Sequence, residues 1–370
     1  MRVTIERSAL LKALNHVQSV VERRNTIPIL SNVLIQASRG VVKLTATDLD
    51  IEIVEQVAAD VSKEGATTAP AHMIYDIVRK LPDGAQLELE VGPDSGRLSV
   101  NAGRSRFQLQ ALPPEDFPNL NAGDLSHSFA VPAADLKNLI DKTRFAISTE
   151  ETRYYLNGIY LPEVAKEGML RAVSTDGHRL AQAQAALPSG AAGMPGVIVP
   201  RKTVLEVVKL LEGVEGDIAV SLSAAKIRFT LAGMVLTSKL IDGTFPDYER
   251  VIPRHNDKLV EVDTRLFSDA VDRVSTISME KGRAVKLNIA NGKIIFTVNN
   301  PDSGSAEEEV ACSYDREPVD IGFNARYLLD IAGQLKSGNA HLLLADAGSP
   351  TIVKDPGDET ALYVLMPMRV

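Results

Sequence analysis

One helical pattern occurs three times in this sequence, at intervals too long for a short structural repeat. Residues 70–81, 200–211 and 324–335 each carry apolar side chains three and four positions apart, which is the spacing of an amphipathic helix. The three segments start 130 and 124 residues apart. Solenoid repeats have periods of roughly 20 to 50 residues. We therefore predict that the repeated unit is a whole domain, present three times.

A second pattern, a short strand followed by a helix, also occurs three times. It begins near Val3, Phe129 and Val260, at intervals of 126 and 131 residues. Runs in which apolar and polar residues alternate follow each of these helices, and such runs are typical of strands. Asp-Gly or Asn-Gly pairs at 83–84, 242–243 and 291–292 indicate tight turns, which favour antiparallel sheets.

These patterns predict an α+β protein with three similar domains, each with two helices on one face of antiparallel sheets. Phe-Pro pairs at 117–118 and 245–246 end the last strands of the first two copies. The predicted domains are therefore residues 1–125, 126–254 and 255–370. A chain of 370 residues, 45% of them hydrophobic, gives each domain enough apolar side chains for its own core.

The net charge argues against a nucleic-acid partner, but the distribution of charge does not. The chain carries a formal charge of −8, whereas phosphate contacts need Lys and Arg concentrated in one place. Basic residues recur on all six predicted helices, while acidic clusters such as Glu307–Glu309 lie in strands and loops. Segregation of this kind gives an acidic protein one basic surface. The basic residues on these helices or at their ends that would form such a surface, and are candidates for contact with DNA, include Lys12, Arg24, Arg79, Lys80, Lys137, Arg201, Lys202 and Lys209.

The sequence holds no motif of a nucleotide-binding loop, a serine hydrolase or a zinc protease, and its six histidines are scattered. We therefore predict no cofactor and no metal. Asp48 and Asp50 leave a magnesium site as an alternative. Asp176 and His178 flank a glycine, so an acid and base of a hydrolase or transferase are another alternative. A monomeric three-domain scaffold without a DNA role is a third.

The two ends of the chain also carry predictions. The start, MRVTIERSAL, lacks the apolar stretch of a signal peptide, and no run approaches the roughly 20 apolar residues that span a bilayer. We therefore expect a cytoplasmic protein without membrane contact. The final residues, YVLMPMRV, are mostly apolar, which predicts a docked rather than a frayed end. Methionines suit a groove that adapts to varied partners, and filling of the core is the alternative.

Several longer motifs resemble one protein family along the whole chain. They are TIPIL at 26, TATDLDIEI at 45, GRSRFQLQALPPEDFPNL at 103, RYYLNG at 153, STDGHRL at 174, VPRK at 199, LIDGTFPDY at 240 and YVLMPMR at 363. Together they resemble the β subunit of bacterial DNA polymerase III, the sliding clamp family. The resemblance implies a DNA-clamp fold in which two chains join head to tail as a ring-shaped homodimer around duplex DNA.

The resemblance also implies a function and a set of partners. The chain would be a non-catalytic processivity subunit of a nucleotidyltransferase, the DNA-directed DNA polymerase holoenzyme that carries out DNA replication. It would bind double-stranded DNA without sequence specificity. The polymerase III catalytic subunit, the clamp loader, other polymerases and repair proteins would attach through short linear peptides, in a groove between the second and third domains.

Site residues follow from the resemblance, position by position. It implies DNA contacts by Arg24, Arg201, Lys202 and Tyr154. Glu150 and the His72–Met73 pair depart from the family pattern, so direct DNA contact is not expected there. The implied peptide groove consists of Arg153, Tyr155, Leu156, Thr175, Gly177, His178, Arg179, Leu180, Pro246, Val251, Asn324, Tyr327, Val364, Met366, Pro367, Met368 and Arg369. The implied dimer interface contains Arg104, Arg106, Ile277, Glu307 and Glu308.

Overall fold

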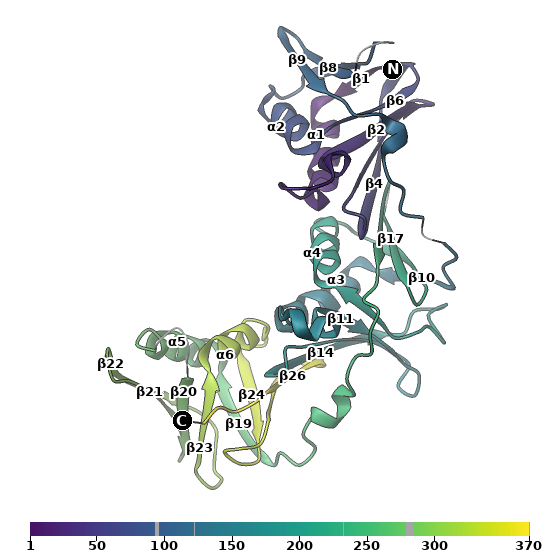
Figure 1. The fold of residues 1–370 in the computed structure, drawn as a ribbon. Helices are drawn as coiled ribbons and strands as arrows, with labels where there is room; N and C mark the ends of the chain where they lie inside the picture. Colours follow the sequence, from purple (N-terminus) through teal and green to yellow (C-terminus); the bar gives the residue numbers. More distant parts are fainter. Residues whose placement is uncertain (93–95, 122, 232, 279–283, 370) are drawn as a thin grey trace. The chain divides into compact units, whose positions relative to one another are not determined.

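The computed structural model describes residues 1–370 except 93–95, 122, 232, 279–283 and 370. Six α-helices lie in this described part, and each occurs where the sequence predicts one (Figure 1). The first helix ends at Val17, and the 3-10 turn η1 (Gln18–Val20) continues it. The helices are α1 (Arg7–Val17), α2 (Ala71–Lys80), α3 (Ala133–Asp141), α4 (Arg201–Leu210), α5 (Thr264–Ser275) and α6 (Ala325–Ala332).

Side chains at the ends of strands cap three of these helices. The Glu6 carboxylate accepts the Ala9 amide at 3.0 Å before α1, and the Asp263 carboxylate accepts the Leu266 amide at 2.8 Å before α5. The Asn324 side chain accepts an amide in the same way at the start of α6. The first amides of a helix have no partner within it, so such caps stabilise the helix start by about 1 kcal/mol.

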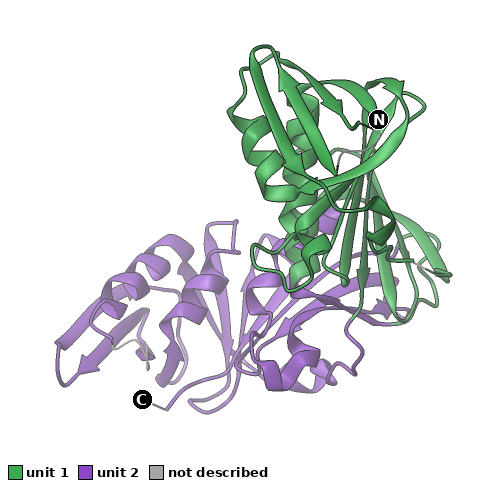
Figure 2. Ribbon diagram, turned by 45° about the horizontal axis from the view of Figure 1, so that its top comes forward, with its two compact units in different colours: residues 1–134, 188–195, 202–240 green, residues 135–187, 196–201, 241–370 purple. Residues whose placement is uncertain are grey.

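The chain forms two compact units, and each is described by itself (Figure 2). Unit 1 comprises residues 1–134, 188–195 and 202–240. Its first sheet has the order β5 (Asp60–Lys63), β1 (Arg2–Glu6), β7 (Gln86–Glu90), β8 (Arg97–Ala102), β9 (Ser105–Gln110). Its second sheet has the order β10 (His127–Pro132), β16 (Asp217–Leu222), β17 (Lys226–Leu231), β18 (Met234–Lys239), β4 (Ile51–Ala58), β3 (Val41–Thr47), β2 (Asn32–Ser38), β6 (Gly65–Pro70). Helix α1 packs on β1, β3, β4 and α2.

Unit 2 comprises residues 135–187, 196–201 and 241–370. Its larger sheet has the order β15 (Val197–Pro200), β11 (Gly158–Leu161), β13 (Met169–Thr175), β14 (Arg179–Ala186), β26 (Asp358–Leu365), β25 (Thr351–Asp355), β24 (Asn339–Leu344), β19 (Lys258–Asp263), with β12 (Glu163–Val164) beside β13. Its smaller sheet has the order β22 (Gly304–Ala311), β21 (Lys293–Asn300), β20 (Ala284–Ala290), β23 (Val319–Asn324). Helix α5 packs on β19 to β22 and on α6.

The two units do not follow the three sequence repeats, because strands of successive repeats pair with each other. In unit 1, β4 pairs with β18, and the Lys239 amide donates to the Asp50 carbonyl at 2.8 Å. In unit 2, β14 pairs with β26, and the Met366 amide donates to the His178 carbonyl at 2.9 Å. The same strand junction is therefore formed twice. Every pairing between the described strands is antiparallel, as the turn signals predict.

The three Asp-Gly and Asn-Gly pairs named above connect different kinds of elements. Asn291 and Gly292 have φ angles of 52° and 76° and join β20 to β21, as a tight hairpin requires. Gly84 (φ 74°) connects α2 to β7 instead. Residues 242–243 follow β18 outside any hairpin. The predicted tight turns are therefore confirmed at 291–292 and at 83–84, where the Ala85 amide donates to the Pro82 carbonyl, and of the two the turn at 291–292 is the hairpin.

The apolar C-terminal segment is docked, which confirms the prediction from its composition. Beyond β26, the Met366 amide donates to His178, and the Met368 amide donates to the Gly322 carbonyl at 2.8 Å. The second bond adds one bridge to the free edge of β23. These bonds hold residues 366–368 against two different sheets of unit 2.

Candidate functional site

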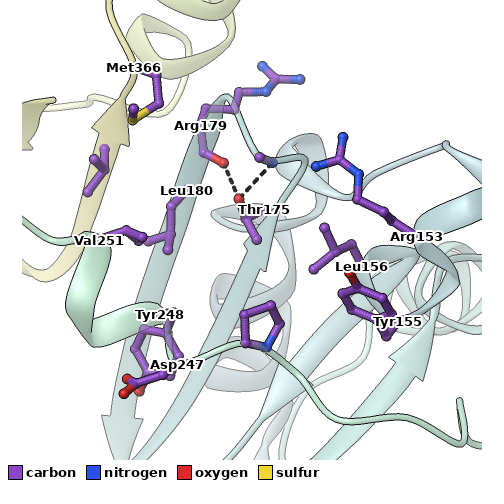
Figure 3. A pocket seen from close by; sticks show the side chains of 13 residues that line it. Arg153, Tyr155, Leu156, Thr175, Arg179, Leu180, Asp247, Tyr248, Val251 and Met366 are labelled. Carbon is purple, nitrogen blue, oxygen red and sulfur yellow. Dashed lines mark hydrogen bonds between the residues drawn. The ribbon is translucent and has the colours of Figure 1, made fainter. Parts of the chain in front are cut away.

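Unit 2 contains a cavity of about 290 Å³ with a largely apolar lining (Figure 3). Its walls come from the 3-10 segment η5 (Glu151–Leu156), the turn between β13 and β14, the segment around η6 (Tyr248–Val251), and the end of β26. The lining residues are Arg153, Tyr155, Leu156, Thr175, Gly177, Arg179, Leu180, Pro246, Asp247, Tyr248, Val251, Val364 and Met366. Segments from distant parts of the chain thus meet at one hollow.

The floor of this cavity belongs to the hydrophobic core. Leu156, Leu180, Tyr248 and Val364 line the cavity and are also members of a buried apolar cluster. In the same cluster the Phe245 ring is stacked on Tyr160, with ring centroids 4.8 Å apart. Because close-packed cores resist deformation, these core side chains fix the shape of the cavity. Such an apolar, preformed hollow suits apolar side chains of a partner.

The turn between β13 and β14 is held by its own side chains. The Thr175 hydroxyl donates to the Arg179 carbonyl at 2.7 Å and accepts the Gly177 amide at 3.1 Å (Figure 3). One carboxylate oxygen of Asp176 accepts the His178 and Arg179 amides. Gly177 has φ +88°, which a residue with a side chain rarely adopts. The motif TDGHR thus specifies a rigid turn at the rim of the cavity.

Unit 1 contains the same turn. The Thr47 hydroxyl donates to the Ile51 carbonyl at 2.8 Å and accepts the Leu49 amide at 3.0 Å. The Asp48 carboxylate accepts the amides of Asp50 and Ile51. Leu49, with φ 77°, stands where the other turn has glycine. The two motifs therefore share a structural role that explains their similarity.

A buried arginine positions η6. The Arg171 guanidinium donates to the Tyr248 hydroxyl at 3.1 Å and to the Gln184 side chain at 3.0 Å. It also pairs with Glu167 at 2.6 Å. Burial raises the pKa of the Tyr248 hydroxyl, which stays protonated at neutral pH. Since a buried charge needs partners, this network fixes the wall that carries Tyr248.

Six residues of the predicted groove do not line this cavity. His178 and Tyr327 line a neighbouring polar hollow of about 440 Å³, where their rings lie 6.3 Å apart. Asn324 caps α6. The bond from Met368 to Gly322 turns the chain away, and Pro367, Met368 and Arg369 line an open hollow beside β23. Of these C-terminal residues of the predicted groove, Met366 lines the cavity, whereas Pro367 and Met368 lie outside it.

Asp247 and Tyr248 line the cavity although sequence reasoning did not place them there. Both residues belong to the motif FPDY. From the sequence alone, this motif predicts only the end of a repeat. The structure shows that this segment also forms the short helix η6 over the cavity.

Arg179 organises the polar side of the site. Its guanidinium pairs with Asp176 at 3.1 Å and with Asp330 at 2.6 Å, and donates to the Phe145 carbonyl at 2.8 Å. It also lies 4.3 Å from the centroid of the Tyr327 ring, a cation–π distance. Arg179 therefore joins the apolar cavity to the polar hollow.

The residues predicted to face DNA differ in their ion pairs. Among the described residues, four of them are exposed and form no ion pair: Lys12, Arg24, Lys80 and Arg201. The other four pair with carboxylates: Arg79 with Asp76, Lys137 with Asp141, Lys202 with Asp48 and Glu22, and Lys209 with Glu206. Tyr154 is 53% exposed. The free cations are thus better able to attract phosphates.

Lys202 has a structural role in unit 1. Its ammonium donates to Asp48, to Glu22 at 3.3 Å and to the Val20 carbonyl at 3.3 Å. Burial by itself lowers the pKa of Lys202, but the hydrogen bonds to the two carboxylates outweigh it and raise the pKa. This lysine therefore links α4 to the turn after α1. The contact could not be predicted from the sequence, because the partners lie far apart along the chain.

The residues predicted at the dimer interface lie on or beside exposed strands. Arg104 and Arg106 are exposed, in the turn before β9 and in β9 itself. Glu307 and Glu308 belong to β22. Arg273 pairs with Glu308 within the chain, and this contact lowers the pKa of the Glu308 carboxyl. Ile277, half-buried, follows α5.

The geometry does not favour Asp176 as a catalytic base or Asp48 as a magnesium ligand. Both Asp176 oxygens are engaged, one by the turn amides and one by Arg179, so the carboxylate is no free base. Asp48 is engaged in the same way by its turn and by Lys202. In the part of the chain that the structure describes, no three His, Cys, Asp or Glu side chains gather as a possible metal site.

Comparison with known proteins decides the family. Models of the DNA polymerase III beta subunit match residues 1–121 (N-terminal domain), 130–247 (central domain) and 249–369 (C-terminal domain). The chain belongs to the DNA polymerase III beta subunit family. It is 56% identical to the beta sliding clamp of Caulobacter vibrioides strain NA1000 / CB15N over 372 residues, and 40% identical to that of Escherichia coli strain K12 over 373 residues. Both comparisons cover 100% of each chain.

Solved structures of this family have the same fold. The sliding clamp of Bartonella birtlesii, solved bound to griselimycin, aligns with a TM-score of 0.98 at 56% identity. That of Pseudomonas aeruginosa, also bound to griselimycin, aligns with 0.94 at 41% identity. Each comparison covers 100% of both chains. These matches confirm the sliding clamp fold predicted from the sequence motifs.

Family membership also settles the class of function. Sliding clamps are non-catalytic processivity factors of DNA replication, so the hydrolase alternative is not supported. The transferase and nucleotidyltransferase terms are not supported for the clamp itself. No helix among the described residues is long and apolar enough to cross a membrane.

Proposed function

We propose that this protein is a replicative sliding clamp, a ring-shaped, head-to-tail homodimer that encircles duplex DNA in the cytoplasm. The observation that carries the proposal is the match of the whole chain to beta sliding clamps at 56% identity. The repeats support three domains per chain, residues 1–125, 126–254 and 255–370. The ring would tether the DNA polymerase III catalytic subunit to its template and so confer processivity.

Two free sheet edges support the dimer. In the described sheets β9 ends the five-stranded sheet and β22 ends the four-stranded sheet. An unpaired edge presents amides and carbonyls to any strand that lies beside it. Arg106 is exposed on β9, and Glu307 and Glu309 are exposed on β22. Antiparallel pairing of β9 with β22 of a second copy would bring these opposite charges together.

An apolar hollow beside β9 supplies the other half of such an interface. It measures about 590 Å³ and lies between α2 and β9, with Met73, Ile77 and Phe107 in its lining. Met73 is 54% exposed. A large apolar side chain in this position is stabilised when a partner covers it. Ile277 of a second copy would enter this hollow, and apolar burial would contribute most of the dimer affinity.

The contact with DNA would be electrostatic and loose. A closed ring stays on DNA by topology, so it does not need tight binding, and contacts to phosphates alone permit sliding. Arg24 and Arg201, which are exposed and lack an ion pair in the described chain, are the best placed of the predicted contacts. Lys202 and Lys209 would contribute less, because carboxylates already neutralise them.

The apolar cavity of unit 2 would bind short linear peptides of the partners. The polymerase, the clamp loader, and other polymerases and repair proteins would share it. Each apolar anchor buried there contributes about 1.5 to 3 kcal/mol. Two anchors are compatible with micromolar affinity, about −8 kcal/mol, which holds a polymerase and still permits exchange.

The experiment measures product length in primer extension on a primed circular template. The reaction contains the replicative polymerase and the clamp loader of the same organism, with and without this protein. We expect products much longer in its presence, at equal polymerase concentration. Sedimentation of the pure protein at micromolar concentration checks the assembly. A monomer in low salt, or unchanged product length with a functional loader, would contradict the proposal.

A further inference from the structure

At the rim of the apolar cavity, Arg153 forms an ion pair with Glu150, three residues before it in the chain. The Arg153 guanidinium donates through Nε to one Glu150 oxygen at 2.9 Å, and its Nη2 lies 2.7 Å from the other oxygen. Two parallel contacts of this kind form a bidentate pair, the strongest arrangement of arginine and carboxylate. The pair raises the pKa of the Arg153 guanidinium. Both side chains are partly exposed, at 33% and 52%.

The backbone presents this pair to the cavity. Arg153 has φ −110° and ψ 52°, which breaks the 3-10 segment η5 at this residue. The Glu150 amide donates to the Ser148 hydroxyl at 3.1 Å, which fixes the start of the segment. In Figure 3 the Arg153 side chain points toward the turn between β13 and β14. The kink therefore brings the guanidinium to the cavity rim while Glu150 stays outside the lining.

The remaining edge of the guanidinium lies over Gly177. A Cβ atom added to Gly177 would stand 2.5 Å from Arg153 Nη1, so the absence of a side chain there makes room for it. Within the described chain, Arg153 forms no ion pair through Nη1. A carboxylate that arrives in the cavity therefore meets a guanidinium whose Nε and Nη2 are held by Glu150 and whose Nη1 is packed against Gly177.

We propose that Glu150 is a built-in competitor for Arg153, and that peptides with a carboxylate beside their apolar anchors displace it. Arg153 and Glu150 would thus set the charge preference of the cavity. This inference rests on the proposed peptide-binding function. The carboxylate can be an aspartate or glutamate side chain or the free C-terminus of the peptide. Arginine binds both in the same bidentate geometry.

The test is calorimetry with three synthetic peptides that share two apolar anchors. One is amidated and has no acid, one is amidated and has an aspartate next to the anchors, and one has a free C-terminus as its only carboxylate. In the wild-type protein we expect the three affinities to agree within about twofold, because displacement of Glu150 offsets the new ion pair. The two acid-bearing peptides separate the two sources of the carboxylate.

Two substitutions separate the roles of the pair. In E150Q we expect at least one acidic peptide to bind about three- to fivefold tighter than the neutral one, the ratio that an exposed ion pair supports. In R153Q we expect no such preference. E151Q removes one charge from the adjacent exposed residue and should behave as wild type, which separates loss of the pair from a general change in charge.

Three outcomes are decisive. Neutral-peptide affinity in E150Q within about twofold of wild type shows that the cavity is intact. An unchanged ratio of acidic to neutral affinity in E150Q, or an equal change in E151Q, overturns the inference alone. If none of the three peptides binds the wild-type protein, the groove assignment fails as well.

Discussion

The peptide cavity predicts how affinity responds when its exposed apolar side chains are removed. Val251 and Met366 line the cavity and are 50% and 40% exposed in the free protein. Full burial of a valine or methionine side chain contributes about 1.5 to 3 kcal/mol. A bound peptide covers only the exposed half, so truncation to alanine should cost about 0.6 to 1.5 kcal/mol of binding free energy at each position.

For V251A/M366A the two losses add to about 1.4 to 2.7 kcal/mol, which weakens binding by about 10- to 100-fold. Folding stability should change little, because both side chains are half exposed before binding. The matched control is L259A/L266A, which removes two side chains that are 44% and 52% exposed and do not line the cavity.

The assay is calorimetry of one partner-derived peptide against wild type and both double variants. Thermal unfolding confirms that all three are folded. We expect the control to bind as wild type does. Equal affinity of V251A/M366A and wild type, or an equal loss in the control, would refute the assignment of this cavity as the peptide site.

Three further predictions concern other parts of the chain. Burial alone would raise the pKa of Asp355, but hydrogen bonds from Ser337 and neighbouring amides hold it at about 2. Since the ordinary pKa is 3.8, up to about 2 kcal/mol of stability should be present above pH 4 and lost as the pH falls to about 2. Chemical denaturation of D355N should show this loss already at pH 7. Removal of residues 366–370 should leave the dimer intact in sedimentation but weaken peptide binding at least as much as M366A. R24A/R201A should lower DNA affinity equally for all sequences and flatten its salt dependence by up to about 0.9 per lost contact. A changed base preference at constant salt slope would contradict that last prediction.

Local sequence patterns predicted the helices and the antiparallel strands well. Apolar spacing marks a helix face without reference to the rest of the chain, so α2, α4 and α6 appear where residues 70–81, 200–211 and 324–335 predict them. Turn chemistry is less local. The Asn-Gly pair at 291–292 forms a hairpin because two strands flank it, whereas Gly84 lies in the connection from α2 to β7.

Long-range contacts explain what sequence reasoning missed at the site. The sequence pattern predicts Lys202 as an unpaired cation on a helix. In the structure it pairs with Asp48, which is 154 residues away in sequence. The family resemblance predicts Met368 in the peptide groove. In the structure the hydrogen bond from its amide to Gly322 holds it beside another sheet. Tyr248 lines the cavity because Arg171, 77 residues before it, holds η6 in place. None of these pairings is encoded in a local pattern.

The central claim, a closed ring around DNA, is tested most directly by retention on DNA of different topology. The protein is loaded by the clamp loader onto a nicked circular plasmid, isolated by gel filtration, and the DNA is then cut once with a restriction enzyme. We predict that the protein stays with the circle and is released within the time of the assay once the DNA has ends. Equal retention on circular and linear DNA would contradict the topological account.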